Sequence, residues 1–428
     1  MKRERTEVLV VGGGPAGLAA AEAAAGAGRS VMLLDDNPRL GGQLWRADVR
    51  DAQSPHGREV DGRRRRLAAA GVVVRMATTV IDAEAPTRLW AHCADELLHL
   101  HADRVVLASG ARELLLPFPG WTRPGVFGVG GLQALVKAGL DVDGRRVVVA
   151  GTGPLLLAVA SALRRKGAKI VHVLEQTSRA RLARFGLGLW RTPSKLTQGL
   201  SLMLRGGALP LRAGAWPCEA HGDPTLRRVT VTDARGSTST IECDLLACGF
   251  GLVPQTRLAR LLSCEVDDGV VVDALQRTSV PNVFAAGELC GIGGHEKALV
   301  EGQIAGLAAA GQLRSARALA GSRRRALAFA RRLARDFALR DALRRLVTDD
   351  TIVCRCEDVP WSHVRDHTDA RHTKLTTRCG MGPCQGRVCQ PALAYLLGHG
   401  PDRPRPPLRP VPLGVLAELR TTIEGTAR

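Results

Sequence analysis

The sequence is poor in aromatic residues and has no long apolar run. Only 3% of its 428 residues are Phe, Trp or Tyr, with a single tyrosine. Aromatic rings are the platforms on which unpaired bases stack, so nucleic acid is not an expected partner although the net charge is +19. The longest apolar runs, such as residues 154–163, are too short to cross a bilayer, so no transmembrane segment is expected.

The N-terminus also lacks the apolar core of a signal peptide, because MKRERTEVLVV passes directly into a strand pattern. We therefore expect a cytoplasmic protein whose eleven cysteines are thiols or metal ligands rather than disulfides. The length, with 45% apolar and 24% charged residues, allows about two to four globular domains.

The densest positive charge lies over residues 323–346, where apolar residues recur at helical spacing. This pattern predicts a helical, arginine-rich connector. Its charged face is either solvated, as most charge runs are, or a docking surface for an acidic partner.

Residues 6–36 have the pattern of a strand, a glycine turn, a helix and a second strand. Gly12 permits a tight turn, Gly14 lets the backbone approach a pyrophosphate, and Gly17 lets the helix pack close to the strand. The helix N-terminus then presents free N–H groups to the phosphates. Asp35 ends the second strand, where a carboxylate can accept hydrogen bonds from a ribose. Together these features predict a dinucleotide site.

Residues 145–176 repeat this pattern with Gly151 and Gly153, and Glu175 ends the second strand. Leu156 stands where a third glycine or alanine would be, so the helix should lie further from the strand. The usual fit of a nicotinamide nucleotide is then altered or lost. The residues leave open whether this second site binds NAD(P), ATP or no nucleotide.

Residues 278–310 contain a third strand–turn–helix pattern, with Gly287 and Glu288 at the turn. An acid at a strand end, beside a helix N-terminus, can hold a ribityl hydroxyl while backbone amides meet a phosphate. His295 and Glu296 follow, but a lone histidine is more typical of a hydrogen-bonded structural residue. We therefore assign no catalytic residues.

The order of these segments, with VVLASGAR at 105–112 and LLACGFG at 245–251 between them, resembles the two-dinucleotide-binding-domain flavoproteins. GGQL at 41–44 matches the glycine pair that this family carries near the flavin. The resemblance implies an α/β fold of two Rossmann-like domains in a glutathione-reductase-like arrangement, with FAD in the first. The residues that it implies near FAD are Gly12, Gly14, Pro15, Ala16, Gly17, Asp35, Asp36, Gly42, Gln43, Gly110, Gly287 and Glu288. The second nucleotide site would use Gly151, Gly153 and Glu175.

Disulfide reductases of this fold carry a C-x-x-C or C-x4-C redox pair beside the flavin. Before residue 354 the one such spacing is Cys243 and Cys248, within a CDLLAC strand pattern. Thioredoxin-reductase-like chemistry is therefore not expected.

Five of the cysteines cluster near the end of the chain, in CRCEDV at 354–359 and RCGMGPCQGRVC at 378–389. Two thiolates from one turn and two from a glycine-rich loop can surround a metal centre. The loop amides can hydrogen-bond cluster sulfurs, and Arg355, Arg378 and Arg387 can offset the thiolate charge. Structural zinc is the competing interpretation, since His363, His367 and His372 lie nearby, although C-x-C is unusual in zinc sites.

This tail resembles the bacterioferritin-associated-ferredoxin-like [2Fe–2S] domain. The resemblance implies Cys354, Cys356, Cys384 and Cys389 as ligands, because CQPAL matches the last ligand and the start of its helix. Cys379 departs from this set and could replace Cys384.

The whole chain resembles the α subunits of opine oxidase, hydrogen cyanide synthase, L-proline dehydrogenase and D-hydroxyproline dehydrogenase. The resemblance implies an electron-transfer subunit of a hetero-oligomer that oxidises an amino or imino acid (D-hydroxyproline, proline, an opine or glycine). The partners would be a catalytic FAD-containing β subunit with a small ferredoxin-like γ subunit, in the cytoplasm or peripherally at the inner face of the membrane. The alternatives are a self-sufficient NAD(P)H-dependent FAD/[2Fe–2S] reductase and, on charge alone, a nucleic-acid-binding protein with a zinc tail.

We accordingly expect a discontinuous FAD domain, a second nucleotide domain, a connector and an iron–sulfur domain with the C-terminal tail. Their expected ranges are 1–140 with 256–315, 141–255, 316–345 and 346–428.

Overall fold

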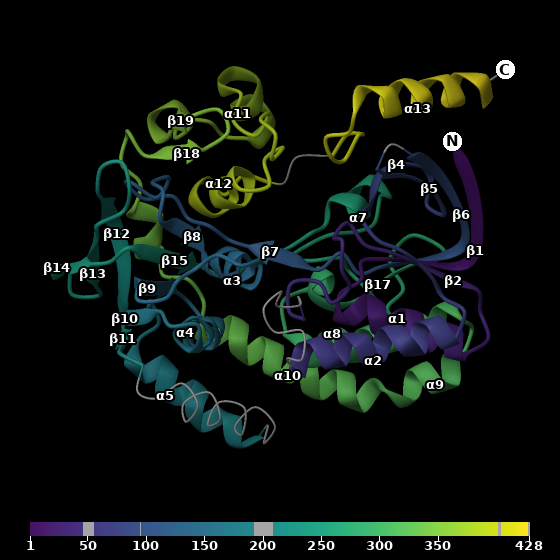
Figure 1. Cartoon of the computed structure of the whole chain (residues 1–428), viewed down its shortest axis with the longest axis horizontal. Helices are drawn as coiled ribbons and strands as arrows, with labels where there is room; N and C mark the ends of the chain where they lie inside the picture. The colour runs from purple at the N-terminus through teal and green to yellow at the C-terminus, as the bar shows by residue number, and fades with distance from the viewer. Residues whose placement is uncertain (46–54, 95, 192–208, 401–403, 427–428) are drawn as a thin grey trace. The chain divides into compact units, whose positions relative to one another are not determined.

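The computed structural model describes residues 1–45, 55–94, 96–191, 209–400 and 404–426 (Figure 1). The chain forms two compact units. Unit 1 comprises Met1–Arg112, Pro254–Ala330 and Arg403–Arg428, and unit 2 comprises Glu113–Val253 and Arg331–Asp402. Strands β7 (Ala111–Glu113) and β16 (Leu252–Pro254), where the chain passes from one unit to the other, form a two-stranded sheet.

The sheet of unit 1 has the strand order β3-β2-β1-β6-β5-β4, and β17 pairs with β6. Strand β1 pairs in parallel with β2 and β6, and its residues Leu9 and Val10 are fully buried, as expected for a strand covered on both faces. Strands β4 and β5 are antiparallel. The strands are β1 (Lys2–Val11), β2 (Val31–Leu34), β3 (Val73–Arg75), β4 (Thr78–Ala85), β5 (Arg88–Cys93), β6 (Glu96–Leu107) and β17 (Val283–Ala285).

Helices α1 (Pro15–Gly26) and α8 (His295–Ala309) pack side by side in unit 1 (Figure 1). Their contact depends on glycine: a Cβ on Gly302 would lie 2.1 Å from the carbonyl oxygen of Ala16, and one on Gly306 2.2 Å from that of Ala20. The small residues therefore allow the two backbones to touch. Unit 1 also contains α2 (Pro55–Ala69), α7 (Arg257–Leu261), α9 (Leu313–Ala318) and the short helix η2 (Gly287–Cys290).

The C-terminal residues belong to unit 1. Val415 and Leu419 of α13 (Leu413–Thr426) are buried against Trp90 and Leu97, and the amide of Leu408 donates to the carbonyl of Ile81 at 2.8 Å. From the sequence, these residues were expected to belong to the iron–sulfur domain at 346–428. The structure assigns them to the other unit because their apolar side chains complete the core beside β4 and β5.

Unit 2 has a parallel sheet of order β11-β10-β9-β15-β8 and an antiparallel sheet of order β12-β13-β14. Residues 113–140, expected in the first domain, belong here because β8 pairs with β15 and α3 packs on the parallel sheet. The elements are β8 (Val126–Gly128), α3 (Val129–Lys137), β9 (Arg146–Gly151), α4 (Leu155–Arg165), β10 (Lys169–Glu175), α5 (Arg179–Gly188), η1 (Leu189–Arg191), β11 (Leu211–Ala213), β12 (Ala215–His221), β13 (Arg228–Asp233), β14 (Thr238–Glu242) and β15 (Leu245–Gly249).

The cysteine-rich segment of unit 2 has a small core of its own, in which Val353, Val359, Val364 and Leu393 pack against three of the cysteines. It follows α10 (Ala320–Asp336), the predicted arginine-rich helix, and η3 (Asp341–Arg345). The segment comprises β18 (Ile352–Cys354), β19 (Val359–Pro360), η4 (Trp361–His363), α11 (Ala370–Thr377) and α12 (Cys389–Leu397).

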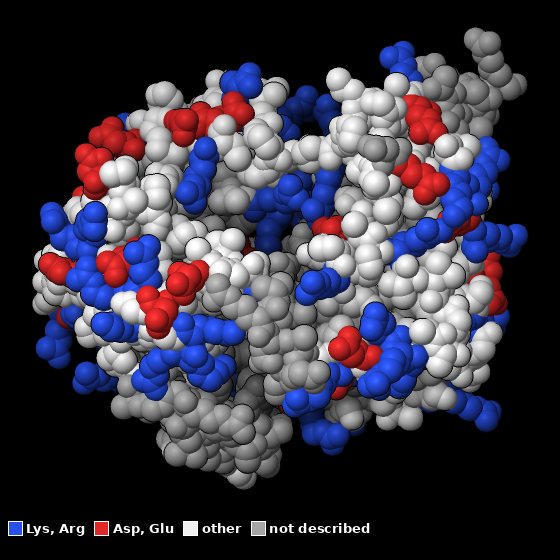
Figure 2. Space-filling view, viewed as in Figure 1, with Lys and Arg blue, Asp and Glu red and all other residues white. Residues whose placement is uncertain are grey.

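The positive charge is dispersed. On the face shown in Figure 2, Lys and Arg are spread over both units with Asp and Glu among them. Some arginines of α10 are used internally: Arg335 pairs with the buried Asp336, and Arg323 with the buried Glu301. Across the described ranges, no helix combines the length and apolarity that crossing a bilayer requires.

Replacing Gly306 by alanine should force α1 and α8 apart, because the new methyl would overlap a backbone carbonyl that cannot rotate away. We expect a loss of about 1–3 kcal/mol of stability, the usual cost of overpacking. The matched control is Gly321→Ala in α10, where an added Cβ meets nothing within 4 Å and should stabilise the helix slightly. Thermal unfolding followed by circular dichroism compares the two; equal midpoints would show that the helices do not touch at Gly306.

Candidate cofactor sites

The first glycine turn has no room for side chains. Gly12 has a φ of +114°, and a Cβ there would lie 2.3 Å from the carbonyl oxygen of Ala108. A Cβ on Gly17 would lie 1.7 Å from the carbonyl oxygen of Gly12. Helix α1 begins at Pro15, a residue suited to the first helical position because it lacks the N–H that would be unpaired there. The N–H groups of the next two residues, Ala16 and Gly17, can then meet phosphate oxygens.

Asp35 lies at this turn, as predicted. Its Oδ2 accepts a hydrogen bond from the amide of Gly13 at 2.5 Å, and its Oδ1 accepts from the amide of Asn37 at 2.7 Å. Burial raises the pKa of Asp35. A carboxylate has further acceptor sites, so these bonds leave capacity for a ribose hydroxyl. Asp36 is used differently, because it is ion-paired with Arg409 of the C-terminal segment.

The predicted GGQL segment lies against the same turn. Gly42 has a φ of +57°, and a Cβ there would lie 3.0 Å from the Cα of Gly14. The amide of Gly41 donates to the carbonyl of Gly13 at 2.9 Å, and Gln43 lies in the turn that follows. Gly110, at the end of the neighbouring strand, has a φ of +69° and open space where its Cβ would be. The structure thus brings the segments 12–17, 35 and 41–43 together.

Glu288 has one buried oxygen that is unpaired within the described part of the chain. Its Oε1 accepts from the amides of Gly293 and Gly294 at 3.1 and 2.7 Å, whereas its Oε2 has no partner. Burial raises the pKa of Glu288. A buried acceptor without a donor is costly, and a hydroxyl of a bound ligand would satisfy it.

A fully buried ion pair fixes the backbone beside Glu288, and the sequence analysis missed it. The Nζ of Lys297 lies 2.7 Å from Oε2 of Glu301 and donates to the carbonyl of Gly287 at 2.9 Å. The same Glu301 oxygen accepts from the amide of Gly287 at 3.1 Å, and Arg323 adds a second cation at 3.5 Å. The i,i+4 spacing of Lys297 and Glu301 in α8 is the signal that could have identified the pair.

The second glycine turn, in unit 2, is built like the first. Gly151 has a φ of +138°, and a Cβ there would lie 1.8 Å from the carbonyl oxygen of Gly249. Both oxygens of Glu175 are hydrogen-bonded, Oε2 by the amide of Gly153 at 2.7 Å and Oε1 by the amide of Thr177 at 2.9 Å. Leu156 is buried in the core between α4 and the sheet.

Residues 336–340 lie against this second turn. Thr152, between the two glycines, donates its hydroxyl to the carbonyl of Phe337 at 3.2 Å. The amide of the Gln176 side chain donates to the carbonyl of Ala338 at 3.2 Å, and Arg340 donates to the carbonyl of Gln176 at 2.6 Å. Residues 336–340 therefore form hydrogen bonds with the polar groups that a nucleotide at this turn would meet.

The two cysteines of C-x-C are held by the residue between them. Arg355 donates to the carbonyl of Thr122 at 3.0 Å, and its guanidinium lies 5.1 Å from the ring centroid of Trp121. Trp121 in turn donates to the carbonyl of Ile352 at 2.5 Å. The turn that carries Cys354 and Cys356 is thus anchored on both of its sides.

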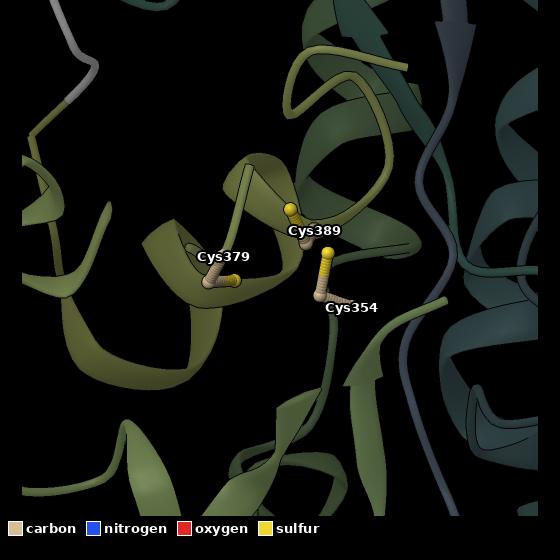
Figure 3. Close-up of side chains that lie close together, drawn as sticks. All are labelled: Cys354, Cys379 and Cys389. Carbon is tan, nitrogen blue, oxygen red and sulfur yellow. The ribbon is translucent and has the colours of Figure 1, made fainter. Parts of the chain in front are cut away.

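Cys354, Cys379 and Cys389 converge in one buried place (Figure 3). Their sulfurs all lie within 4.8 Å of one another, and each residue is at most 3% exposed. The neighbouring thiols of Cys379 and Cys389 hold the pKa of Cys354 well below the usual value of a cysteine. Among the described residues, this is the one group of three or more His, Cys, Asp or Glu close enough to hold a metal ion, and it contains no histidine.

Cys356 and Cys384 form a second pair. The pKa of Cys356 is raised, and Cys384 is the neighbour that shifts it most, its backbone amide downward and its thiol upward. The four predicted ligands therefore lie as two pairs, 354 with 389 and 356 with 384. Cys379, the fifth thiol, lies beside the first pair.

Residues 6–314 match the family model described as pyridine nucleotide-disulphide oxidoreductase. Hydrogen cyanide synthase subunit HcnB of Pseudomonas aeruginosa is 32% identical, with 96% of this chain and 98% of HcnB covered. An opine oxidase subunit from Rhizobium meliloti is also 32% identical, with the same coverage of 96% and 98%. The solved structure of L-proline dehydrogenase from P. horikoshii superposes with a TM-score of 0.67 at 21% identity, covering 97% of this chain and 80% of that one. These likenesses confirm the predicted α/β fold and the predicted group of relatives.

Replacing Lys297 by methionine should remove the cation that lies 2.7 Å from the buried Glu301 carboxylate and leave Arg323, which lies 3.5 Å away. We expect a loss of about 3–5 kcal/mol of stability, typical of breaking a buried ion pair, and a lower content of bound flavin as the Gly287 turn loosens. Unfolding midpoints and flavin per chain measure the two effects. The control is Arg5→Met, whose 81%-exposed side chain pairs with Asp103 and should cost little; equal effects of the two variants would contradict the prediction.

Proposed function

Because the chain belongs to the pyridine nucleotide-disulphide oxidoreductase family and is an FAD-dependent oxidoreductase, we propose that it is the electron-transfer α subunit of a heteromeric amino- or imino-acid dehydrogenase. In this proposal it passes electrons between a partner's flavin and an external acceptor. Its relatives that are named as subunits, over nearly the full length of the chain, support this assignment. The single observation that carries it is that one chain contains both a tight glycine turn in unit 1 and a buried group of three cysteines in unit 2.

The residues of unit 1 would hold FAD in a definite way. The N-terminus of α1, with Pro15 to Gly17, would receive the pyrophosphate, Asp35 would accept from the ribose, and the unpaired oxygen of Glu288 would accept from the ribityl chain. The Lys297–Glu301 pair would keep that oxygen in position through the Gly287 backbone. Gly42, packed on Gly14, would keep the backbone close to the cofactor.

The cysteine site would hold a [2Fe–2S] cluster through Cys354, Cys356, Cys384 and Cys389. Two thiol pairs, with no histidine among them, suit iron and sulfide better than structural zinc, which favours C-x2–4-C pairs. A flavin exchanges electrons in pairs and a [2Fe–2S] cluster exchanges them singly, so the two together convert between both modes.

The substrate would be oxidised on a partner, a catalytic FAD-containing β subunit, with a small ferredoxin-like γ subunit completing the assembly. The acids of unit 1 support this, because Asp35 and Glu301 already accept hydrogen bonds from backbone amides and Glu288 would face the flavin in this proposal. No acid–base pair for C–N bond oxidation is assigned on this chain. The proposal keeps the cytoplasmic location expected from the sequence, with peripheral binding to the inner face of the membrane as its variant.

The alternative, a self-sufficient NAD(P)H-dependent reductase, needs a nicotinamide nucleotide at the second glycine turn. The bonds from Thr152 and Gln176 to residues 337 and 338 argue against it. We propose that neither NAD(P) nor ATP binds at this turn.

The isolated chain should contain flavin, iron and acid-labile sulfide, yet oxidise proline, hydroxyproline, opines or glycine very slowly. Co-expression with its partner should restore dehydrogenase activity and co-purify the complex. Cofactor analysis, mass spectrometry of co-purified proteins and dye-linked assays measure this. Rapid turnover by the chain alone, or a colourless protein that binds zinc without sulfide, would refute the proposal.

NADH and NADPH should fail to bleach the visible absorbance of the flavin under anaerobic conditions, whereas dithionite should bleach it fully. The variant Thr152→Val removes the hydroxyl that donates a hydrogen bond to the carbonyl of Phe337. It tests whether the contact of residues 336–340 with this turn is what excludes the nucleotide. Rapid reduction of the unaltered protein by either nucleotide would favour the reductase instead.

A further inference from the structure

The cysteine segment offers five thiols, whereas a [2Fe–2S] cluster held by cysteine takes four, two on each iron. From the sequence, Cys379 competes with Cys384. In the structure Cys379 lies with Cys354 and Cys389 instead. The glycines of the loop between α11 and α12 explain this arrangement.

Gly382 brings Cys384 to Cys356. A Cβ on Gly382 would lie only 2.3 Å from the Cβ of Cys356, so the loop passes directly over the second cysteine of C-x-C at this point. Cys384 follows two residues later, and its backbone amide and thiol both shift the pKa of Cys356, as expected of a close neighbour. The pair is therefore set by a backbone contact that no residue larger than glycine allows.

Gly380 brings Cys379 to the other pair. A Cβ on Gly380 would lie 3.9 Å from the sulfur of Cys389, and the sulfurs of Cys354, Cys379 and Cys389 lie within 4.8 Å of one another. Arg378, at the end of α11, has a left-handed φ of +63°, and its side chain is ion-paired with Glu357 at 2.8 Å. These contacts hold Cys379, only 3% exposed, facing Cys354 and Cys389.

We propose that Cys379 is a reserve ligand that can take the place of Cys389, and not that of Cys384. The inference rests on the proposed [2Fe–2S] site. Cys356 and Cys384 would supply two of the four ligands, and Cys354 with either Cys389 or Cys379 would supply the other two. In the exchange one iron–sulfur bond breaks and one forms, the entering thiol gives up its proton and the leaving thiolate takes one, so the charge of the site is unchanged.

The test compares Cys389→Ser, Cys379→Ser, Cys384→Ser and the double variant Cys379→Ser/Cys389→Ser in the full chain. Iron and acid-labile sulfide per chain are measured, and the reduced cluster is examined by electron paramagnetic resonance. We expect both Cys389→Ser and Cys379→Ser to keep the cluster, the former with a shifted spectrum because its ligand has changed. Cys384→Ser and the double variant should lose it.

Loss of the cluster from Cys389→Ser to the same extent as from Cys384→Ser would overturn the inference. The inference would also be overturned if the Cys384→Ser variant kept its iron and lost it only when Cys379 was replaced as well. Bound flavin and far-ultraviolet circular dichroism show whether each variant is folded, and Cys389→Ala replaces Cys389→Ser if the buried hydroxyl prevents folding. An unaltered chain without iron and sulfide would refute the proposed function itself, which separates the two failures.

Discussion

The close approach of α1 to the backbone around it is the constraint on which unit 1 depends. Gly12 and Gly17 leave no space for a side chain between the first turn, Ala108 and the start of the helix. On its other side α1 touches α8 through Gly302 and Gly306. Because α8 also carries Lys297 and Glu301, whose side chains bond the Gly287 backbone, α1 and α8 connect the first glycine turn to the Gly287 turn.

Unit 2 repeats the glycine turn but combines it with different surroundings. Gly151 makes the same tight approach to a neighbouring strand, and Glu175 holds the same place as Asp35. What differs is the use of the polar groups between them, since Thr152 and Gln176 bond the chain that leads into the cysteine segment. The same local motif therefore has different neighbours in the two units, because in unit 2 its polar groups bond residues 337 and 338.

Much of this was predictable from short sequence patterns. The two glycine turns, the position of Asp35 and the grouping of the cysteines depend on residues close in sequence, where spacing fixes geometry. The Lys297–Glu301 pair had a local signal, but its burial depends on the packing of α8. Other contacts join segments that are distant in sequence, and no sequence pattern predicts them. They are the contact of residues 336–340 with Thr152, the ion pair of Asp36 with Arg409 and the grouping of the five thiols. Tertiary packing decides such contacts.

The return of residues 403–428 to unit 1 has a consequence for biosynthesis. Val415 and Leu419 complete the core beside Trp90, yet they are translated after the whole cysteine segment. Since domains fold as units during synthesis, unit 1 must wait with Ile81, Trp90 and Leu97 uncovered until the last helix leaves the ribosome. The cysteine segment thus separates two parts of unit 1 along the chain, and deleting everything after it would expose the apolar side chains of Trp90 and Leu97.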